Sequence, residues 1–181
     1  MTGLAAALIS YDDFVKLQDP ENGKRYELHD GEVVLVPPAR PVHLVLQMRL
    51  LEMLRVVEDR GFGVVMEFPY RPAPRYQFWY ADVAIVSRSI QAEMVVWTDY
   101  RPYAPDLVVE VKSASNTEMK LGKQRIASMS NGTREFWFID GEKKTIQVTN
   151  ESDARTYGAG ESIEVLGLAR FIHVDAVFAG I

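Results

Sequence analysis

Two acidic side chains interrupt strongly apolar stretches of the sequence. Asp82 lies within residues 79–86, and Glu110 lies within residues 107–111 and is followed closely by Lys112. A buried carboxylate without a partner is costly, so each must lie at a strand end, form an ion pair or hold a cation. Hard oxygen ligands bind Mg²⁺, and a nearby ammonium can offset the charge of a phosphate. These residue types therefore fit metal-assisted hydrolysis of a phosphodiester bond.

Strand periodicity relates the second carboxylate to its neighbours. Side chains alternate between the two faces of a strand, so Asp106, Glu110 and Lys112 are expected to share one face. The Cβ atoms of Glu110 and Lys112 would then be roughly 6 to 7 Å apart, which leaves room for water or phosphate between the head groups. We expect Asp82 and Glu110 to bind the metal and Lys112 to orient the attacking water or stabilise the transition state. Asp106 is a secondary metal ligand, or simply a turn residue after Pro105.

The elements that must position these groups can be read from the apolar patterns. A hairpin is expected around Asp30-Gly31, a dipeptide suited to a type I′ turn, and a helix is expected from Pro41 to Gly61. A second helix should start at Ser115, which has capping-box spacing to Glu118, with Met119, Ile126 and Met129 on its apolar face. The predicted fold is α/β, with a mixed central sheet. Its expected strands are Gly63 to Phe68, Trp79 to Val86, Leu107 to Ser113, Glu135 to Ile139 and Thr145 to Val148.

Composition limits the classes of protein that the chain can represent. With 181 residues, of which 48% are hydrophobic and 25% charged, one domain spanning residues 1–181 is expected. The net charge of −5 offers no broad attraction to a polyanion, so any nucleic-acid site must be local. The absence of cysteine excludes disulfides and thiolate zinc sites. Without a basic leader or a long apolar run, the expected location is the cytoplasm.

A family resemblance sharpens the interpretation of the two carboxylates. Asp82 followed on the next strand by Glu110-Val111-Lys112 resembles the signature of the PD-(D/E)XK nucleases. Further motifs, from about Tyr11 to Gly167 and on to Phe178, resemble the Uma-type restriction endonuclease family. These motifs are Tyr26-Glu27-Leu28, Asp30-Gly31-Glu32, His43, Asp82-Val83-Ala84, Pro105 to Val111, Ser113, Ser115, Gly132 and Glu135-Phe136-Trp137.

The resemblance implies a restriction-endonuclease-like mixed central β-sheet flanked by α-helices. It also implies a Mg²⁺ site, with Mn²⁺ as a substitute, on Asp82 and Glu110, and DNA as the substrate. Nucleases of this architecture often cut two strands by pairing subunits, which suggests a homodimer. The chain departs from the family by carrying Lys112 where leucine is common and Gln124 where lysine is common. Ala81 and Ser128 replace a usual proline and a frequent tyrosine.

Five further residues are candidates for the site. Glu27 matches the first acidic residue of the family and, with Gln124, is expected to support catalysis; the alternative is a surface cross-strand partner. His43 is a candidate for substrate contact, or a polar residue that faces solvent at a helix start. Lys120 and Lys123 would bind DNA phosphates if the site is real, and otherwise form a solvated helix face.

The sequence leaves other functions open. A catalytically inactive nucleic-acid-binding or regulatory module on the same fold would agree with the acidic net charge. A phosphodiesterase acting on RNA or small nucleotides would share the chemistry but differ in its groove. Glu110 and Lys112 could also form an ordinary ion pair on a solvated face.

Overall fold

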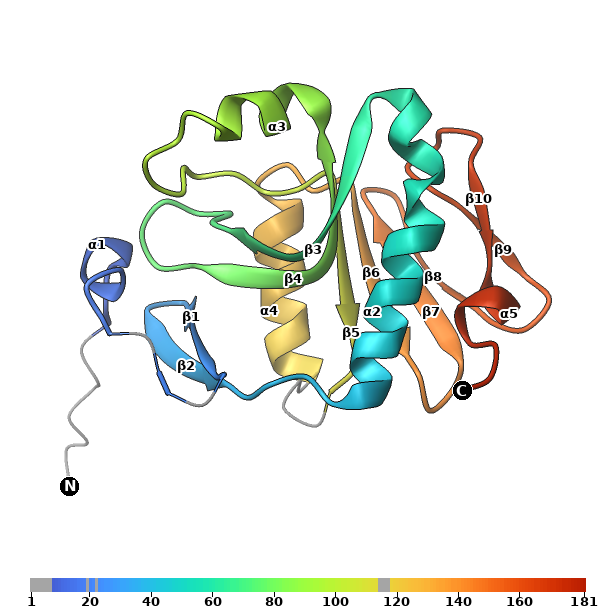
Figure 1. Ribbon diagram of the computed structural model, residues 1–181, viewed down its shortest axis with the longest axis horizontal. Coiled ribbons are helices and arrows are strands. Elements are labelled where there is room, and N and C mark those ends of the chain that lie inside the picture. Colours follow the sequence, from blue (N-terminus) through green and yellow to red (C-terminus); the bar gives the residue numbers. More distant parts are fainter. Residues whose placement is uncertain (1–7, 19, 22, 114–117) are drawn as a thin grey trace.

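The computed structural model describes residues 8–18, 20–21, 23–113 and 118–181. Its centre is a six-stranded sheet in the order β3-β4-β5-β6-β7-β8, in which β5 and β6 are parallel and the other neighbours are antiparallel. The mixed α/β fold predicted from the sequence is thereby confirmed (Figure 1). The strands are β3 (Phe62–Tyr70), β4 (Trp79–Ser87), β5 (Leu107–Val111), β6 (Glu135–Asp140), β7 (Thr145–Asn150) and β8 (Ala154–Tyr157).

The predicted hairpin is confirmed and lies beside the sheet. Strands β1 (Arg25–His29) and β2 (Glu32–Val36) pair antiparallel, and Asp30 and Gly31 both adopt positive φ, as a type I′ turn requires. Leu28 forms two backbone hydrogen bonds with Phe78, the residue before β4. These bonds attach β1 to the start of β4.

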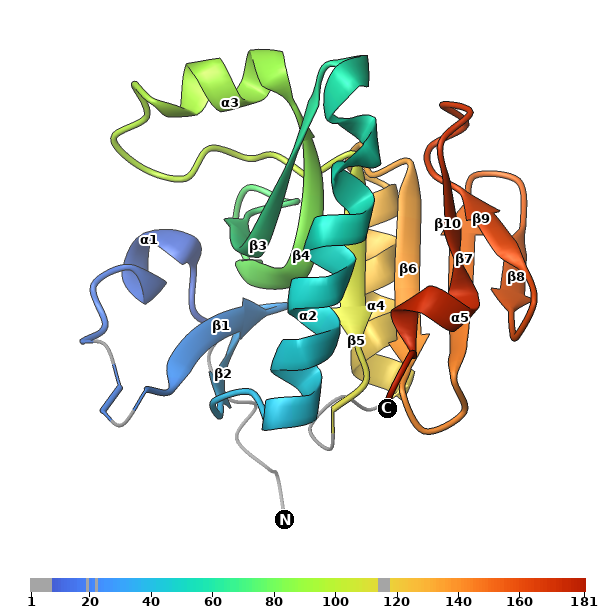
Figure 2. The ribbon, with the colours of Figure 1, turned by 45° about the vertical axis from the view of Figure 1, so that its right-hand side comes forward.

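Helix α2 (Pro41–Leu54) covers one face of the sheet (Figure 2). Pro41 begins it, as expected, because proline fits the first helical turn. Its apolar spacing places Leu46, Leu50 and Leu54 in the main core with strand residues. The helix gives way to a 3₁₀ segment, η1 (Arg55–Arg60), and Gly61, at φ 86°, ends that segment.

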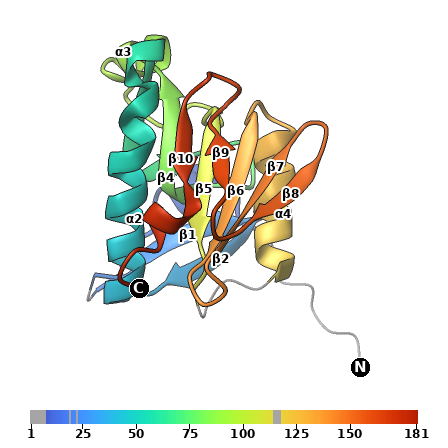
Figure 3. The same ribbon diagram turned by 90° about the vertical axis from the view of Figure 1, so that its right-hand side faces the viewer.

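Helix α4 (Glu118–Met129) covers the opposite face, so that the sheet lies between α2 and α4 (Figure 3). The predicted apolar face of this helix was wrong for two of its three residues, because Met119 and Ile126 are 73% and 64% exposed. Gln124 and Ser128 are buried instead. The predicted cap at Ser115 falls on residues 114–117, outside the described part of the chain.

Several short elements were not anticipated from the sequence. They include α3 (Arg88–Met94) after β4, and the C-terminal pair β9 (Ser162–Glu164) and β10 (Phe171–His173) with α5 (Val174–Val177). The short helix that the sequence predicts over Ser10 to Leu17 is present as α1 (Tyr11–Phe14) and is shorter than expected. Residues of β9, β10 and α5 join the core on the α2 side of the sheet. No helix among the described residues is long and apolar enough to cross a membrane.

Candidate active site

The two candidate metal-binding carboxylates meet where strands β4 and β5 separate. The antiparallel ladder between these strands runs from Ile85–Leu107 to Val83–Val109, and the register places Asp82 across from Glu110 at the next step. There the backbone N–H of Val111 donates to Asp82 Oδ2 at 2.6 Å. The Asp82 carboxylate thus satisfies a backbone donor at the fork between the two strands.

Glu110 extends toward helix α4. Gln124 Nε2 donates to Glu110 Oε1 at 2.7 Å, and the same amide nitrogen lies 3.2 Å from the hydroxyl of Tyr70 on β3. That hydroxyl pairs with Ser128 Oγ at 2.9 Å. The polar residues buried on α4 therefore form one chain of hydrogen bonds that ends on Glu110, which explains why this helix face is not apolar.

The third carboxylate of the cluster, Glu27, belongs to strand β1 of the hairpin. Glu27 is buried; its Oε2 lies 2.7 Å from His29 Nε2, and its Oε1 lies 3.5 Å from Arg25 Nε. The His29 ring stacks on Trp79 at 3.9 Å between centroids. The attachment of β1 to the start of β4 brings this carboxylate into the electrostatic range of Glu110.

Helix α2 contributes two side chains that hold Asp82. His43 Nε2 lies 2.9 Å from Asp82 Oδ1, and Gln47 Nε2 donates to the same oxygen at 2.8 Å. Gln47 also donates to Glu67 on β3. His43 was expected near the site as a substrate contact, whereas Gln47 and Glu67 were not singled out from the sequence.

Glu67 occupies an unusual place in its strand. Met66 pairs with Val83 and Phe68 pairs with Ala81, so Glu67 lies opposite Asp82 between two regular pairs. Its φ is 52°, a left-handed value that is rare for a residue with a side chain. Arg25 Nη1 also binds the Glu67 carboxylate. An acidic residue within an apolar strand was the available sequence signal, the same signal that indicated Asp82.

The electrostatics of the cluster centre on Glu110. Burial raises the pKa of Glu110 well above its ordinary value, and the nearby carboxylates of Asp82 and Glu27 raise it further. The hydrogen bond from Gln124 acts in the opposite direction and lowers it. Burial likewise raises the pKa of Tyr70, whose hydroxyl remains protonated at neutral pH. The site therefore concentrates negative charge that a cation would relieve.

Lys112 and Asp106 lie at opposite ends of β5. Lys112 follows the strand, and its Nζ contacts Glu142 at 2.7 Å and Asp140 at 3.2 Å. Asp106 precedes the strand and accepts from the backbone N–H of Ser87 at 3.2 Å. Asp106 precedes Glu110 by four residues, and at the rise of an extended strand this separates the two residues by roughly 13 Å. The catalytic role of Lys112 and the ligand role of Asp106 stay predictions, and neither side chain joins the carboxylate cluster in this structure.

The two lysines of α4 differ in their surroundings. Lys123 pairs with Asp30 of the hairpin turn at 3.0 Å. Lys120 is partly buried and lies one helical turn before Gln124, on the same side of α4. Both belong to the helix that carries Gln124, and their expected contacts with phosphate stay predictions.

The donor set fits a divalent cation. Asp82 and Glu110 offer carboxylate oxygens, the ligands preferred by Mg²⁺ and Mn²⁺, and both are oriented by hydrogen bonds from neutral groups. Among the described residues, however, no three His, Asp or Glu side chains form a complete metal-binding group by themselves. Amide or backbone oxygens, or water, must complete the coordination of an ion here.

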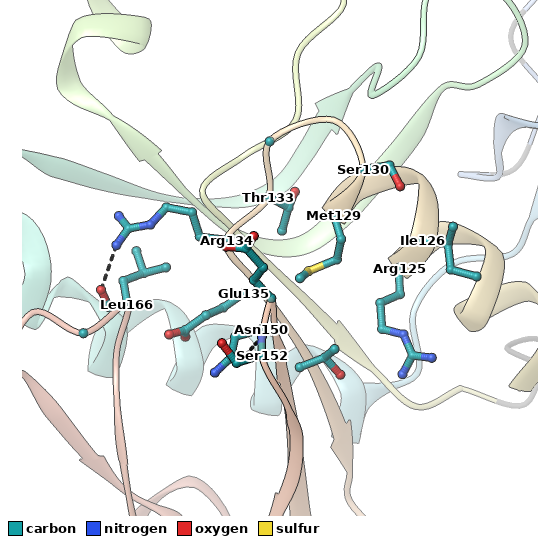
Figure 4. A pocket seen from close by; sticks show the side chains of 14 residues that line it. Arg125, Ile126, Met129, Ser130, Thr133, Arg134, Glu135, Asn150, Ser152 and Leu166 are labelled. Atoms are coloured by element: carbon teal, nitrogen blue, oxygen red, sulfur yellow. Dashed lines mark hydrogen bonds between the residues drawn. The ribbon is translucent and has the colours of Figure 1, made fainter.

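A separate open hollow of about 830 Å³ lies where strand β6 begins and strand β7 ends (Figure 4). It is lined by the end of α4, the following turn and the loop that contains Leu166, with Arg125, Met129 and Thr133 on its walls. None of the predicted site residues lines it. The hollow therefore contributes nothing to the carboxylate cluster.

Comparisons with known proteins bear on the fold and the family of the chain. The chain is similar to a protein from Anabaena variabilis whose crystal structure is titled a "putative nuclease belonging to DUF820", with a TM-score of 0.79 and 18% identity over 94% of this chain and 97% of that one. At this identity the likeness shows the fold. No curated protein matches the chain. A sequence profile of the Uma2 family, described as "Putative restriction endonuclease", matches residues 11–181, and the chain therefore belongs to that family.

Proposed function

We propose that the chain is a Mg²⁺-dependent endonuclease that hydrolyses phosphodiester bonds of DNA. The observation that carries this proposal is the buried carboxylate of Glu110 at the strand fork, beside Asp82 and within the field of Glu27. Gathering buried carboxylates does not stabilise a protein. Such a cluster therefore indicates a functional site that binds a cation. Membership of a family described as restriction endonucleases supports the choice of nucleic acid.

Each residue of the cluster has a task in this proposal. Asp82 and Glu110 would hold the ion, which, when bound, would supply Lewis acidity and compensate charge at the phosphate. Gln124 keeps Glu110 in place, and His43 with the Val111 N–H keeps Asp82 in place. Glu27 lies close enough to raise the pKa of Glu110 and supports the site electrostatically.

DNA would approach the site through a small region of basic side chains. Lys120 and Lys123 lie on α4, the helix that carries Gln124, and would contact phosphates, with Lys123 leaving its ion pair with Asp30. The net charge of −5 makes such a local rim necessary, because the whole surface does not attract a polyanion. Cutting both strands would require two such sites, which a homodimer would provide.

Plasmid cleavage tests the proposal directly. Supercoiled plasmid is incubated with the wild type, with Glu110→Gln and with Glu52→Gln, in Mg²⁺, in Mn²⁺ and in EDTA. Glu52 is a suitable control because it is an exposed carboxylate on α2, with 78% of its side chain accessible. The wild type and Glu52→Gln should cut in metal alone, and Glu110→Gln should not. No cutting in either metal, or equal cutting by Glu110→Gln, would instead favour a non-catalytic binding module.

A further inference from the structure

The hollow beside α4 has the size of a binding site. Its volume of about 830 Å³ lies within the range of roughly 300 to 1,000 Å³ that small-molecule sites occupy. It is lined by the second half of α4, the start of β6, the turn after β7 and the loop that contains Leu166 (Figure 4). Arg134 Nη2 donates to the carbonyl of Leu166 at 2.9 Å and ties this loop to the start of β6. The walls of the hollow are therefore formed without a ligand.

Thr133 indicates that the hollow is built for a ligand. The residue lines the hollow and is only 4% exposed, yet its Oγ1 has no hydrogen-bond partner among the described residues. Leaving a buried hydroxyl unpaired destabilises the folded state, and most such groups are paired in folded proteins. A ligand that reaches this hydroxyl supplies the missing partner.

Arg125 adds a positive charge to the hollow. Its side chain is half-buried and forms no ion pair or hydrogen bond with the residues that the structure describes. A guanidinium binds the oxygens of a phosphate through parallel hydrogen bonds. Figure 4 shows Arg125 at one end of the hollow and Arg134, which is committed to Leu166, at the other. Arg125 is therefore free to hold an anionic group.

Ile126 and Met129 form an apolar wall next to Arg125. The two residues are three apart in the sequence and share one side of α4. Ile126 is 64% exposed, although its spacing predicted a place in the core. Apolar side chains and the thioether of methionine pack well on the face of an aromatic ring. The wall is therefore suited to a flat ring.

Hydrogen-bonding groups line the same hollow. Asn150 Oδ1 accepts two backbone N–H groups of the turn after β7, each at 2.9 Å, which fixes the amide and leaves its nitrogen as a donor. Thr133 adds its unpaired hydroxyl. A nucleobase combines a flat face that stacks on side chains with a polar edge that forms hydrogen bonds. A ring without a polar edge would leave both groups unpaired.

From these contacts we propose that the hollow binds a nucleoside monophosphate. The base would lie on Ile126 and Met129 with its edge toward Thr133, and the phosphate would pair with Arg125. A free nucleotide and the 5′-phosphorylated end of a DNA strand both present these groups. The site is separate from the carboxylate cluster and requires no metal ion, so this inference goes beyond the proposed function.

Calorimetry in EDTA tests the inference without reference to catalysis. The full chain is titrated with dAMP, with deoxyadenosine and with inorganic phosphate. Two further probes are a single DNA strand that begins with 5′-phosphorylated adenosine and the same strand with a 5′ hydroxyl. The wild type should bind one dAMP or one phosphorylated strand per chain, roughly tenfold or more tightly than the probes that lack the phosphate or the base.

Variants of the lining residues assign the binding to the hollow. Arg125→Gln should weaken binding by roughly tenfold or more, because a charge-assisted hydrogen bond is lost. Thr133→Val keeps the shape of the side chain and removes the unpaired hydroxyl. It should also bind roughly tenfold more weakly, yet melt about 2–4 °C higher than the wild type without ligand. Glu110→Gln and Arg60→Gln, the latter at an exposed arginine outside the hollow, should bind as the wild type does.

Several outcomes would overturn the site. No binding of either phosphate-bearing probe, or undiminished binding by Arg125→Gln or Thr133→Val, excludes it. Equal binding of deoxyadenosine or of inorganic phosphate rejects a nucleotide as the ligand. Loss of binding in Glu110→Gln would place the nucleotide at the carboxylate cluster instead. Binding of the phosphorylated strand but not of dAMP identifies a strand end as the ligand. A wild type that binds nucleotide but cuts no plasmid would support this site and reject the proposed nuclease.

Discussion

Asp82 Oδ2 accepts the backbone N–H of Val111 at 2.6 Å, so that a side chain of β4 replaces a backbone partner of β5 where the two strands separate. The other oxygen of the same carboxylate accepts from Gln47 and contacts His43. Asp82 therefore has a structural task in addition to its proposed task as a ligand.

Substitutions of Asp82 should separate these two tasks. Asp82→Ala removes the acceptor of the Val111 N–H, one of the two acceptors of the Gln47 amide and the partner of His43, and it is expected to lower the free energy of unfolding by about 2–4 kcal/mol. Asp82→Asn keeps an oxygen for the Val111 N–H and should be destabilised less, yet both variants should lose metal-dependent cleavage. Urea denaturation with EDTA measures the stability, and plasmid cleavage measures the activity. Equal stability of the two variants would contradict the structural task.

Glu110→Gln should stabilise the metal-free protein in a pH-dependent way. The pKa of Glu110 is raised above its ordinary value of 4.5, so the folded state binds a proton that the unfolded state has released. By linkage, wild-type stability falls as pH rises from about 4.5 through the raised pKa. The variant keeps the acceptor for Gln124 without the charge, and its advantage should reach on the order of 1 kcal/mol or more at neutral pH.

Thermal melting in EDTA at several pH values checks this linkage. The two proteins should melt alike near pH 4, where the carboxyl is protonated in both states. The variant should gain several degrees at pH 7.5, since 1 kcal/mol corresponds to roughly 2–4 °C at this chain length. Divalent ions should raise the melting temperature of the wild type more than that of Glu110→Gln. A pH-independent difference would mean that Glu110 is not held at a raised pKa.

The central strands and α2 could be predicted because burial determines their sequences. Residues of β4 and β5 are apolar on both faces because helices cover both sides of the sheet, and Leu46 and Leu50 keep helical spacing in the core. The Asp30-Gly31 turn was equally clear, since its backbone needs positive φ. In these places, local preference and tertiary structure agree.

The site could be predicted only in part, because its buried polar side chains do not follow the apolar spacing that identifies the strands and helices. On α4 the buried face is Gln124 and Ser128, so a search for apolar spacing selected Met119 and Ile126, which are exposed. Glu67 joins the cluster through a backbone conformation that no sequence pattern indicates. The alternation that grouped Lys112 with Glu110 holds only inside β5, which ends at Val111.

Gln124 offers a test of how Glu110 is oriented. Gln124→Leu removes the donor to Glu110 and to the Tyr70 hydroxyl and should weaken metal binding by roughly tenfold to a hundredfold. Gln124→Lys restores the residue that resembles the family pattern and places an ammonium near Glu110, which should lower the pKa of that carboxyl and preserve cleavage. Calorimetry with Mn²⁺ and plasmid cleavage measure the two effects. Ile126→Gln, at an exposed position of the same helix, should behave as wild type, and a Leu variant that binds metal normally would remove Gln124 from the site.

Lys112→Ala should affect cleavage far less than Glu110→Gln. Hydrogen bonds to Glu142 and Asp140 raise the pKa of Lys112, so its ammonium stays charged at neutral pH and cannot accept a proton from water. To reach the phosphate it would have to leave both ion pairs. Because exposed ion pairs contribute little, we expect cleavage within about threefold of wild type and a nearly unchanged melting temperature. Glu142→Gln, which loosens the ammonium without removing it, is the matched control. A loss of a hundredfold or more in Lys112→Ala, with Glu142→Gln active, would mean that the ammonium turns to the substrate during the reaction and would restore the role predicted from the strand pattern.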